Sequence, residues 1–167
     1  KASPKSYIEF VNVGVNEKLI GVFNPHTQDK LLLVSKFGKG FISIAENMLT
    51  NQKKGKNIFR LKNEDELLKV HFINKDHLAL VSKNEKLLIF DLGSLPTLNK
   101  GSGVQLMKIK SNDSLSDCAI IDINEGLSWR KGSKIKNFKE IKFWIGKRAQ
   151  VGKKIPKGFN KNLKFNI

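Results

Sequence analysis

The sequence contains little of the chemistry that most enzymes use. Among 167 residues there are one cysteine, one tyrosine and three histidines. The single cysteine, Cys118, excludes an internal disulfide and a cluster of thiolate metal ligands. It is expected to be a small buried residue of a cytoplasmic protein. No apolar run approaches the roughly 20 residues of a membrane-spanning helix, so no membrane contact is expected.

The three histidines stand apart from other candidate ligands and nucleophiles. None of His26, His71 and His77 has a second histidine, a cysteine or a carboxylate at metal-ligand spacing. His71 lies among apolar residues and is expected to be packed rather than catalytic. The segment 38–40 lacks the ending of a phosphate-binding loop, so a hairpin turn explains its glycines. We therefore expect no catalytic residue, no metal site and no cofactor in this chain.

Acidic residues are scarce relative to basic ones. Fifteen acids against 31 basic residues leave a net charge of +16 and a pI near 10.0. This balance predicts a polyanionic partner. Lysines outnumber arginines 28 to 3, which suits contacts to phosphate rather than reading of bases. An AT-rich genome can produce the same bias.

The basic residues are concentrated in two regions. From Arg130 to the end there are 13 basic residues and one acid, Glu140. A second cluster occupies 53–62, and the acidic turn 64–66 follows it. A surface charged only for solubility would mix the two signs. The separation therefore favours a binding surface.

The sequence contains a repeated unit. Residues 31–42 align with 78–89 at an offset of 47, and 55–62 align with 103–110 at an offset of 48. A repeat of about 40–50 residues built from short strands and turns is typical of a propeller-like array of small sheets. Two similar strands in an ordinary sandwich are the alternative.

Short apolar or alternating segments bounded by turn residues predict an all-β protein. One helical turn is expected within 45–51. Strands are expected at 7–13, 19–23, 30–35, 41–44, 57–61, 67–73, 78–82, 86–90, 104–109, 118–123 and 163–167.

The expected organisation is a leader at 1–6 followed by one domain at 7–167. Its repeat units span about 29–74 and 76–122, and a divergent basic part spans about 126–167. The chain begins without methionine and without a secretory signal. We expect it to be the downstream part of a longer polypeptide.

These segments resemble the C-terminal domain of type IIA topoisomerase A subunits, most closely that of the alphaproteobacterial topoisomerase IV enzymes. The resemblance covers nearly the whole chain from about Ile8. It is carried by 31–40, Gln52-Lys53-Lys54-Gly55-Lys56-Asn57, Gly103-Val104-Gln105-Leu106, Leu115-Ser116-Asp117, Glu125-Gly126-Leu127-Ser128-Trp129, Gly146-Lys147-Arg148-Ala149, Gly152-Lys153 and Pro156-Lys157-Gly158-Phe159.

The resemblance implies a β-pinwheel, which is a propeller-like disc of four-stranded blades that exchange strands. This chain is expected to have fewer blades than a full family domain. Such domains bind and bend double-stranded DNA, and help the ATP-dependent core in decatenation and supercoil relaxation. The resemblance implies an A2B2 holoenzyme that contains the B subunit together with the N-terminal part of the A subunit, using ATP and Mg²⁺ outside this domain. The isolated domain is expected to be a monomer, in the cytoplasm and associated with the nucleoid. Tyr7 lacks the family's catalytic context.

Gyrase A subunits carry a box of the form Gln-Arg-Arg-Gly-Gly-Lys-Gly, which they need for DNA wrapping. Gln52 to Asn57 is a degenerate version without the second and last glycines. This departure favours topoisomerase IV over gyrase.

The candidate DNA-binding residues fall in equivalent turns or connectors of the two units and in the basic tail. No surface stripe of aromatic residues is expected, so duplex is favoured over single strands. The candidates are Lys36, Lys39, Lys53, Lys54, Lys56, Arg60, Lys83, Lys86, Lys100, Arg130, Lys131, Lys147, Arg148, Lys153 and Lys154.

Three other functions remain open at this point. A gyrase A domain would wrap DNA chirally. A propeller-like protein-interaction module would use its face and bind duplex weakly at physiological salt. An RNA-binding protein would prefer structured RNA.

Overall fold

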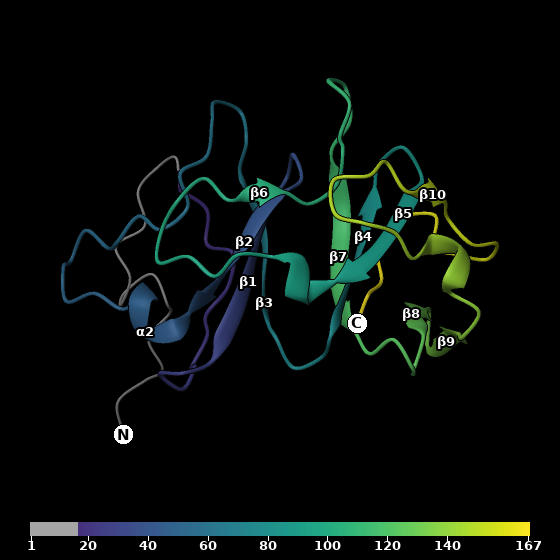
Figure 1. Ribbon diagram of the computed structural model, residues 1–167, viewed down its shortest axis with the longest axis horizontal. Helices are drawn as coiled ribbons and strands as arrows, with labels where there is room; N and C mark the ends of the chain where they lie inside the picture. Colours follow the sequence, from purple (N-terminus) through teal and green to yellow (C-terminus); the bar gives the residue numbers. More distant parts are fainter. Residues whose placement is uncertain (1–16) are drawn as a thin grey trace.

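The computed structural model describes residues 17–167, in which two four-stranded antiparallel sheets stand side by side and a two-stranded sheet follows (Figure 1). The first sheet has the order β3-β1-β2-β6, the second β10-β5-β4-β7, and the third β8-β9. The expected leader at 1–6 and strand at 7–13 lie outside the described residues. The expected all-β class is confirmed.

The first sheet is formed by β1 (Lys30–Ser35), β2 (Lys39–Ile44), β3 (Leu67–Phe72) and β6 (Val104–Gln105), and the short helix α2 (Ala45–Met48) follows β2. The second is formed by β4 (His77–Ser82), β5 (Lys86–Asp91), β7 (Leu115–Ile121) and β10 (Lys153–Lys154). The third is formed by β8 (Leu127–Lys131) and β9 (Lys134–Phe138), and the short 3₁₀ helices span Leu92–Ser94 and Lys142–Trp144. The central strands are continuous apolar runs because both of their faces are buried.

Each four-stranded sheet receives its edge strand from the next unit of the chain. β6 follows β5 in sequence but pairs with β2, and Val104 lies opposite Gly40. β10 follows the third hairpin but pairs with β5, and Lys153 lies opposite Leu87. Neighbouring units are therefore joined by backbone hydrogen bonds as well as by side-chain packing.

A glycine precedes each of these edge strands for a steric reason. Gly103 and Gly152 have φ values of 70° and 82°. A Cβ at Gly103 would lie 2.7 Å from the carbonyl oxygen of Gly40, and one at Gly152 would lie 2.6 Å from that of Leu87. Only glycine allows both this backbone conformation and this close approach.

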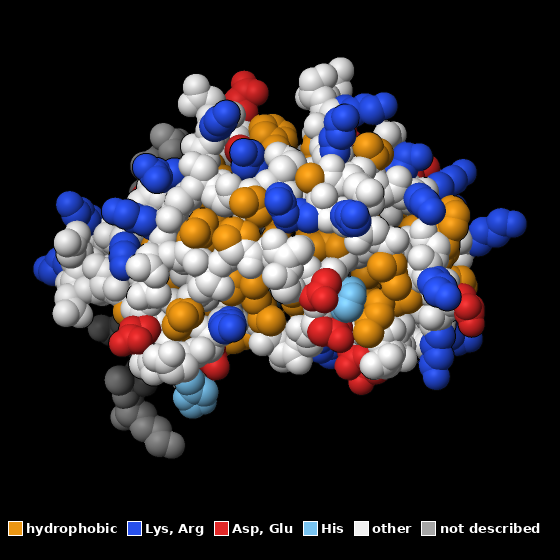
Figure 2. Space-filling view, viewed as in Figure 1, with side chains coloured by type: hydrophobic (Ala, Val, Ile, Leu, Met, Phe, Trp, Pro, Cys, Tyr) orange, Lys and Arg blue, Asp and Glu red, His pale blue; other side chains and the backbone are white. Residues whose placement is uncertain are grey.

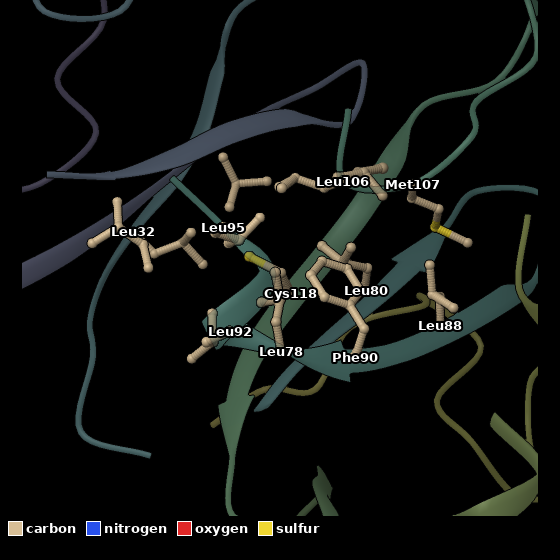
Figure 3. Close-up of a cluster of buried hydrophobic side chains, with 13 residues drawn as sticks. Leu32, Leu78, Leu80, Leu88, Phe90, Leu92, Leu95, Leu106, Met107 and Cys118 are labelled. Atoms are coloured by element: carbon tan, nitrogen blue, oxygen red, sulfur yellow. The ribbon is translucent and has the colours of Figure 1, made fainter. Parts of the chain in front are cut away.

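Two clusters of buried side chains hold the sheets together. The first lies between the first and second sheets, and Figure 3 shows Leu106 and Met107, which directly follow β6, approaching Leu80 and Phe90 of the second sheet. The second cluster joins the other face of the second sheet to the third sheet and includes Trp129. The second sheet is therefore covered on both faces.

A buried carboxylate ties the three parts together. Asp117 on β7 is 2% exposed. Its Oδ1 lies 2.5 Å from Nζ of Lys69 on β3, and its Oδ2 accepts a 2.8 Å hydrogen bond from the backbone N–H of Phe165. The carboxylate thus connects the first sheet, the second sheet and the C-terminal segment.

Four expected strands are shorter than predicted or absent. No strand is assigned at 19–23, although Phe23 packs edge-to-face on Phe72. The segment 57–61 forms only one bridge, from Phe59 to Gly101. The strand expected at 104–109 ends at Gln105.

The expected last strand, 163–167, is also absent. Leu163 and Asn166 have φ values of 59° and 56°, which are incompatible with an extended strand. Phe165 still accepts a backbone hydrogen bond from Arg130. Among the described residues, no helix is long and apolar enough to span a bilayer.

Candidate nucleic-acid interface

The two hairpin turns of the repeat lie at the same end of the strands, at the top in Figure 1. The turns have the same internal hydrogen bond. The Ser35 hydroxyl accepts from the backbone N–H of Lys39 at 3.0 Å, and the Ser82 hydroxyl accepts from that of Lys86 at 3.3 Å. The repeat therefore places four predicted lysines at equivalent positions: Lys36, Lys39, Lys83 and Lys86.

Asp65 fixes the geometry of the first turn. Its Oδ1 accepts a 3.0 Å hydrogen bond from the backbone N–H of Phe37, and its Oδ2 accepts one of 2.8 Å from the Ser35 hydroxyl. This carboxylate is part of the acidic turn 64–66. It serves to hold the lysine-bearing turn in place.

A hollow of about 440 Å³ opens beside this turn. Phe37, Leu61 and Ile109 supply apolar lining. Five cations and two carboxylates also line it, a formal net charge of +3. The charged residues are Lys39, Arg60, Lys62, Lys108, Lys110, Asp65 and Asp113.

A second hollow, of about 430 Å³, lies against β10. Lys153 lines it, with its Nζ 4.2 Å from the ring centroid of Phe143, a cation–π contact. Lys154, the next residue, lies opposite Lys86 in the strand register. Lys108 lines both hollows, so they adjoin. The first hollow carries most of the cations, and the second adds Lys153. We call the two neighbouring hollows the hairpin-end track.

Of the fifteen predicted residues, Lys39, Arg60 and Lys153 line the two hollows, and the others lie outside them. Lys53, Lys54 and Lys56 are exposed in a loop, where Nζ of Lys56 donates to the Asn47 carbonyl. Lys100 is exposed next to Gly101, whose carbonyl accepts from Arg60.

The predicted residues of the tail have different contacts in the structure. Arg148 donates a 2.9 Å hydrogen bond from Nη1 to the carbonyl of Gln105 and so holds β6 in place. Lys147 is exposed. Arg130 and Lys131 are exposed on β8 of the third sheet and line neither hollow.

Sequence reasoning left three cations of the hairpin-end track out of the candidate list. Lys62, Lys108 and Lys110 line the first hollow. The signal was present in the repeat, because Lys62 aligns with Lys110 at the offset of 48. The three lie on irregular segments, whose approach to the turn depends on the tertiary structure.

The opposite end of the strands carries paired acidic groups. Asp76 lies 2.9 Å from Nδ1 of His77, and Glu125 lies 3.4 Å from Nζ of Lys75. The hydrogen bond from His77 lowers the pKa of Asp76. On the face of the molecule drawn in Figure 2, blue side chains extend across the upper part, and a group of red ones with a histidine lies near the lower edge. The hairpin end also carries exposed acids, among them Glu85.

The remaining titratable groups of the interior have structural roles. Nε2 of His71 donates a 3.1 Å hydrogen bond to the carbonyl of Cys118. Burial lowers the pKa of His71 and raises that of the Cys118 thiol to about 12, so this thiol is unreactive at neutral pH. Within 17–167, no group of three or more His, Cys, Asp or Glu residues is placed to hold a metal ion.

The fold and the track define a class: a domain of strand-exchanging blades with a cationic edge. The family model "DNA gyrase C-terminal domain, beta-propeller" matches residues 29–74 and 76–122, and the chain belongs to this family. The expected resemblance and the β-pinwheel fold are thereby confirmed.

The relatives are A subunits of topoisomerase IV. The chain is 35% identical over 167 residues to the A subunit of DNA topoisomerase 4 from Rickettsia bellii, covering 99% of this chain and 22% of that protein. It is 35% identical over 149 residues to the same subunit from Caulobacter vibrioides, covering 89% of this chain and 19% of that protein. The chain thus spans about a fifth of each relative.

A solved structure has the same fold. The E. coli ParC C-terminal domain superposes with a TM-score of 0.77 at 20% sequence identity, covering 90% of this chain and 65% of that one.

Proposed function

We propose that this chain binds duplex DNA along the hairpin-end track and holds it bent as an accessory domain of the topoisomerase IV A subunit. The observation that carries the proposal is the excess of cations in the first hollow, together with Lys108, which also lines the second hollow beside the neighbouring sheet. The family supports it, as do the relatives, which are named as A subunits of topoisomerase 4.

The side chains of the track suit a sugar–phosphate backbone. Lysine ammonium groups contact phosphate as point charges and carry no base specificity. The apolar lining of the first hollow would contact deoxyribose between two phosphates. A duplex held by two sheets at once makes more contacts when it bends, and these offset the cost of bending.

In the whole enzyme, this domain would present DNA to a catalytic core outside this chain. That core would be formed by the N-terminal part of the A subunit, paired with the B subunit in an A2B2 assembly, with ATP and Mg²⁺ used there. The domain would add binding energy and orientation for decatenation and supercoil relaxation in the cytoplasm, at the nucleoid. This role rests on the relatives, of which the chain spans about a fifth.

Duplex binding over a salt series tests the proposal. Arg60, Lys62 and Lys110 are exposed in the first hollow, and we would change all three to alanine. If each contacts a phosphate, the slope of log K against log salt should become shallower by about 2.7. Affinity at low salt should fall at least about tenfold. Fluorescence anisotropy of a labelled duplex measures both quantities.

The matched control removes the same charge elsewhere. Lys157, Lys161 and Lys164 are exposed and line neither hollow. Changing these three to alanine should leave most of the slope intact. Equal losses in the two triple variants would mean diffuse attraction and would contradict the track. Weak, salt-insensitive binding by the unchanged chain would support a protein-interaction module, and preference for structured RNA an RNA-binding protein.

A gyrase-like wrapping domain is the second candidate, because the family model is that of gyrase. Gln52 to Asn57 lacks two glycines of the gyrase box, and its segment is exposed. We expect no supercoils of uniform hand when a nicked plasmid is ligated in the presence of the chain. Supercoils of one hand would favour the gyrase alternative.

A further inference from the structure

The third hairpin lacks the edge strand that completes the other two. β8 and β9 form a two-stranded sheet, and no described residue pairs with the outer edge of β9. On the other side, β8 is approached by the C-terminal segment, because Arg130 donates its backbone N–H to the carbonyl of Phe165. The outer edge of β9 therefore presents unpaired backbone groups, which can accept an added strand.

The two completed sheets show how such a strand would dock. In both, the third residue after the glycine donates its backbone N–H to the residue just before the second strand of the hairpin. Leu106 donates to Gly38 at 2.6 Å, and Ile155 donates to Glu85 at 3.0 Å. Counting back from Lys134, the first residue of β9, makes Ser133 the equivalent acceptor in the third hairpin.

A side chain at this edge lacks the neighbouring strand that buries its equivalent in the second sheet. Leu87, the second residue of β5, is fully buried beneath β10. Its equivalent in β9 is Ile135, which is 59% exposed. An apolar side chain on an added strand would shield it from water.

The charges around this edge indicate the net charge of the strand that it would bind. Lys131, Lys134, Lys136 and Lys139 are all exposed, and Glu140 is the one acid in this stretch. Coulomb attraction here selects an acidic segment.

We propose that the outer edge of β9 binds an extended acidic segment of a partner protein, which adds as a strand in the manner of β6 and β10. A second copy of this chain is a poor occupant. Its segment that aligns with Gly103 in the repeat, at Gly55, carries Lys53, Lys54 and Lys56 and would be repelled. Duplex DNA would satisfy the lysines but neither the backbone groups of β9 nor Ile135.

A designed peptide tests the proposal. The probe is the labelled peptide Glu-Glu-Gly-Val-Glu-Leu-Glu-Glu, which copies the Gly-Val-x-Leu pattern of 103–106 with acids added. Its binding to the 167-residue chain is measured by anisotropy, and amide hydrogen exchange is followed by mass spectrometry. We expect saturable binding with slowed exchange at 133–138.

Three matched comparisons make the test specific. N-methylation of the peptide's leucine nitrogen removes the hydrogen bond to Ser133 and should weaken binding at least about tenfold. The double variant Lys134→Glu, Lys136→Glu should lose its preference for the acidic peptide. It should instead prefer a peptide in which lysines replace the glutamates. The same reversal at Lys157 and Lys161, which are exposed elsewhere, should leave the preference unchanged.

Four results would overturn the proposal. The first is no saturable binding, and the second is equal affinity of the methylated and unmethylated peptides. The third is amide exchange at β9 that, in the absence of peptide, becomes slower as the protein concentration rises, since a second copy would then occupy the edge. The fourth is equal slowing at 133–138 by a duplex.

Discussion

The second and third hairpins share an antiparallel pairing of two strands but differ in sequence and in surroundings. β4 and β5 are flanked by β7 and β10 and are buried on both faces. β8 and β9 form a sheet of two strands with no flanking strand among the described residues, and every residue of β9 is at least partly exposed. The difference shows that a unit of this repeat is completed by the following unit, so its stability depends on strand exchange as well as on its own sequence.

The largest difference should appear at the paired positions Leu87 and Ile135. Leu87→Ala removes a fully buried side chain and should lower the free energy of unfolding by about 3–4 kcal/mol. Ile135→Ala removes an exposed one and should cost less than about 0.5 kcal/mol. Urea unfolding measures both. Similar costs would mean that β9 is covered in solution.

Substitution of Asp117 tests whether its carboxylate holds the C-terminal segment against the sheets. Asp117→Asn weakens the contact to Lys69 and should cost about 2 kcal/mol, less than for a fully buried pair because water screens the partly exposed ammonium. Removing the exposed pair by Glu125→Gln should cost less than about 0.5 kcal/mol. These values come from thermal and urea unfolding. An Asp117 variant as stable as the Glu125 variant would contradict the role of the buried carboxylate.

The glycines before the edge strands provide the next comparison. Gly152→Ala introduces both a strained backbone and a Cβ 2.6 Å from the Leu87 carbonyl, and should cost about 2 kcal/mol. Gly55 has a similar φ of 79° but no atom within 4 Å of a Cβ, so Gly55→Ala should cost only about 1 kcal/mol. Equal losses would show that strain alone matters and that β10 tolerates displacement.

The smallest expected effect concerns His71. Its pKa is lowered, chiefly by burial, so between its folded pKa and the ordinary value near 6.5 the unfolded chain binds more protons. Its contribution to stability is therefore present above pH 6.5 and lost as pH falls through this range. Urea unfolding at several pH values should give a shallower dependence for His71→Gln than for the unchanged chain. An identical dependence would place the titrating group elsewhere.

The sequence by itself determined the strands that are buried on both faces. The runs 30–35, 78–82 and 86–90 are continuous and apolar, and a turn of matching length separates the strands of each hairpin. Apolar runs of this length, bounded by turn residues, are typical of paired strands, so the repeat predicted the two hairpins and the lysines of their turns. The basic character of the chain and its family were also determined at this level.

Only the tertiary structure decided which strand pairs with which sheet and where the cations meet. Strand exchange places Val104 and Gln105 against a hairpin more than 60 residues earlier, and their two-residue pairing is too short for periodicity to indicate. The structure also brings Lys108 and Lys110 beside Arg60, while Arg148, in the same basic tail as Lys153, serves the backbone. Local sequence records charge and periodicity, but the position of an irregular segment depends on long-range hydrogen bonds and packing.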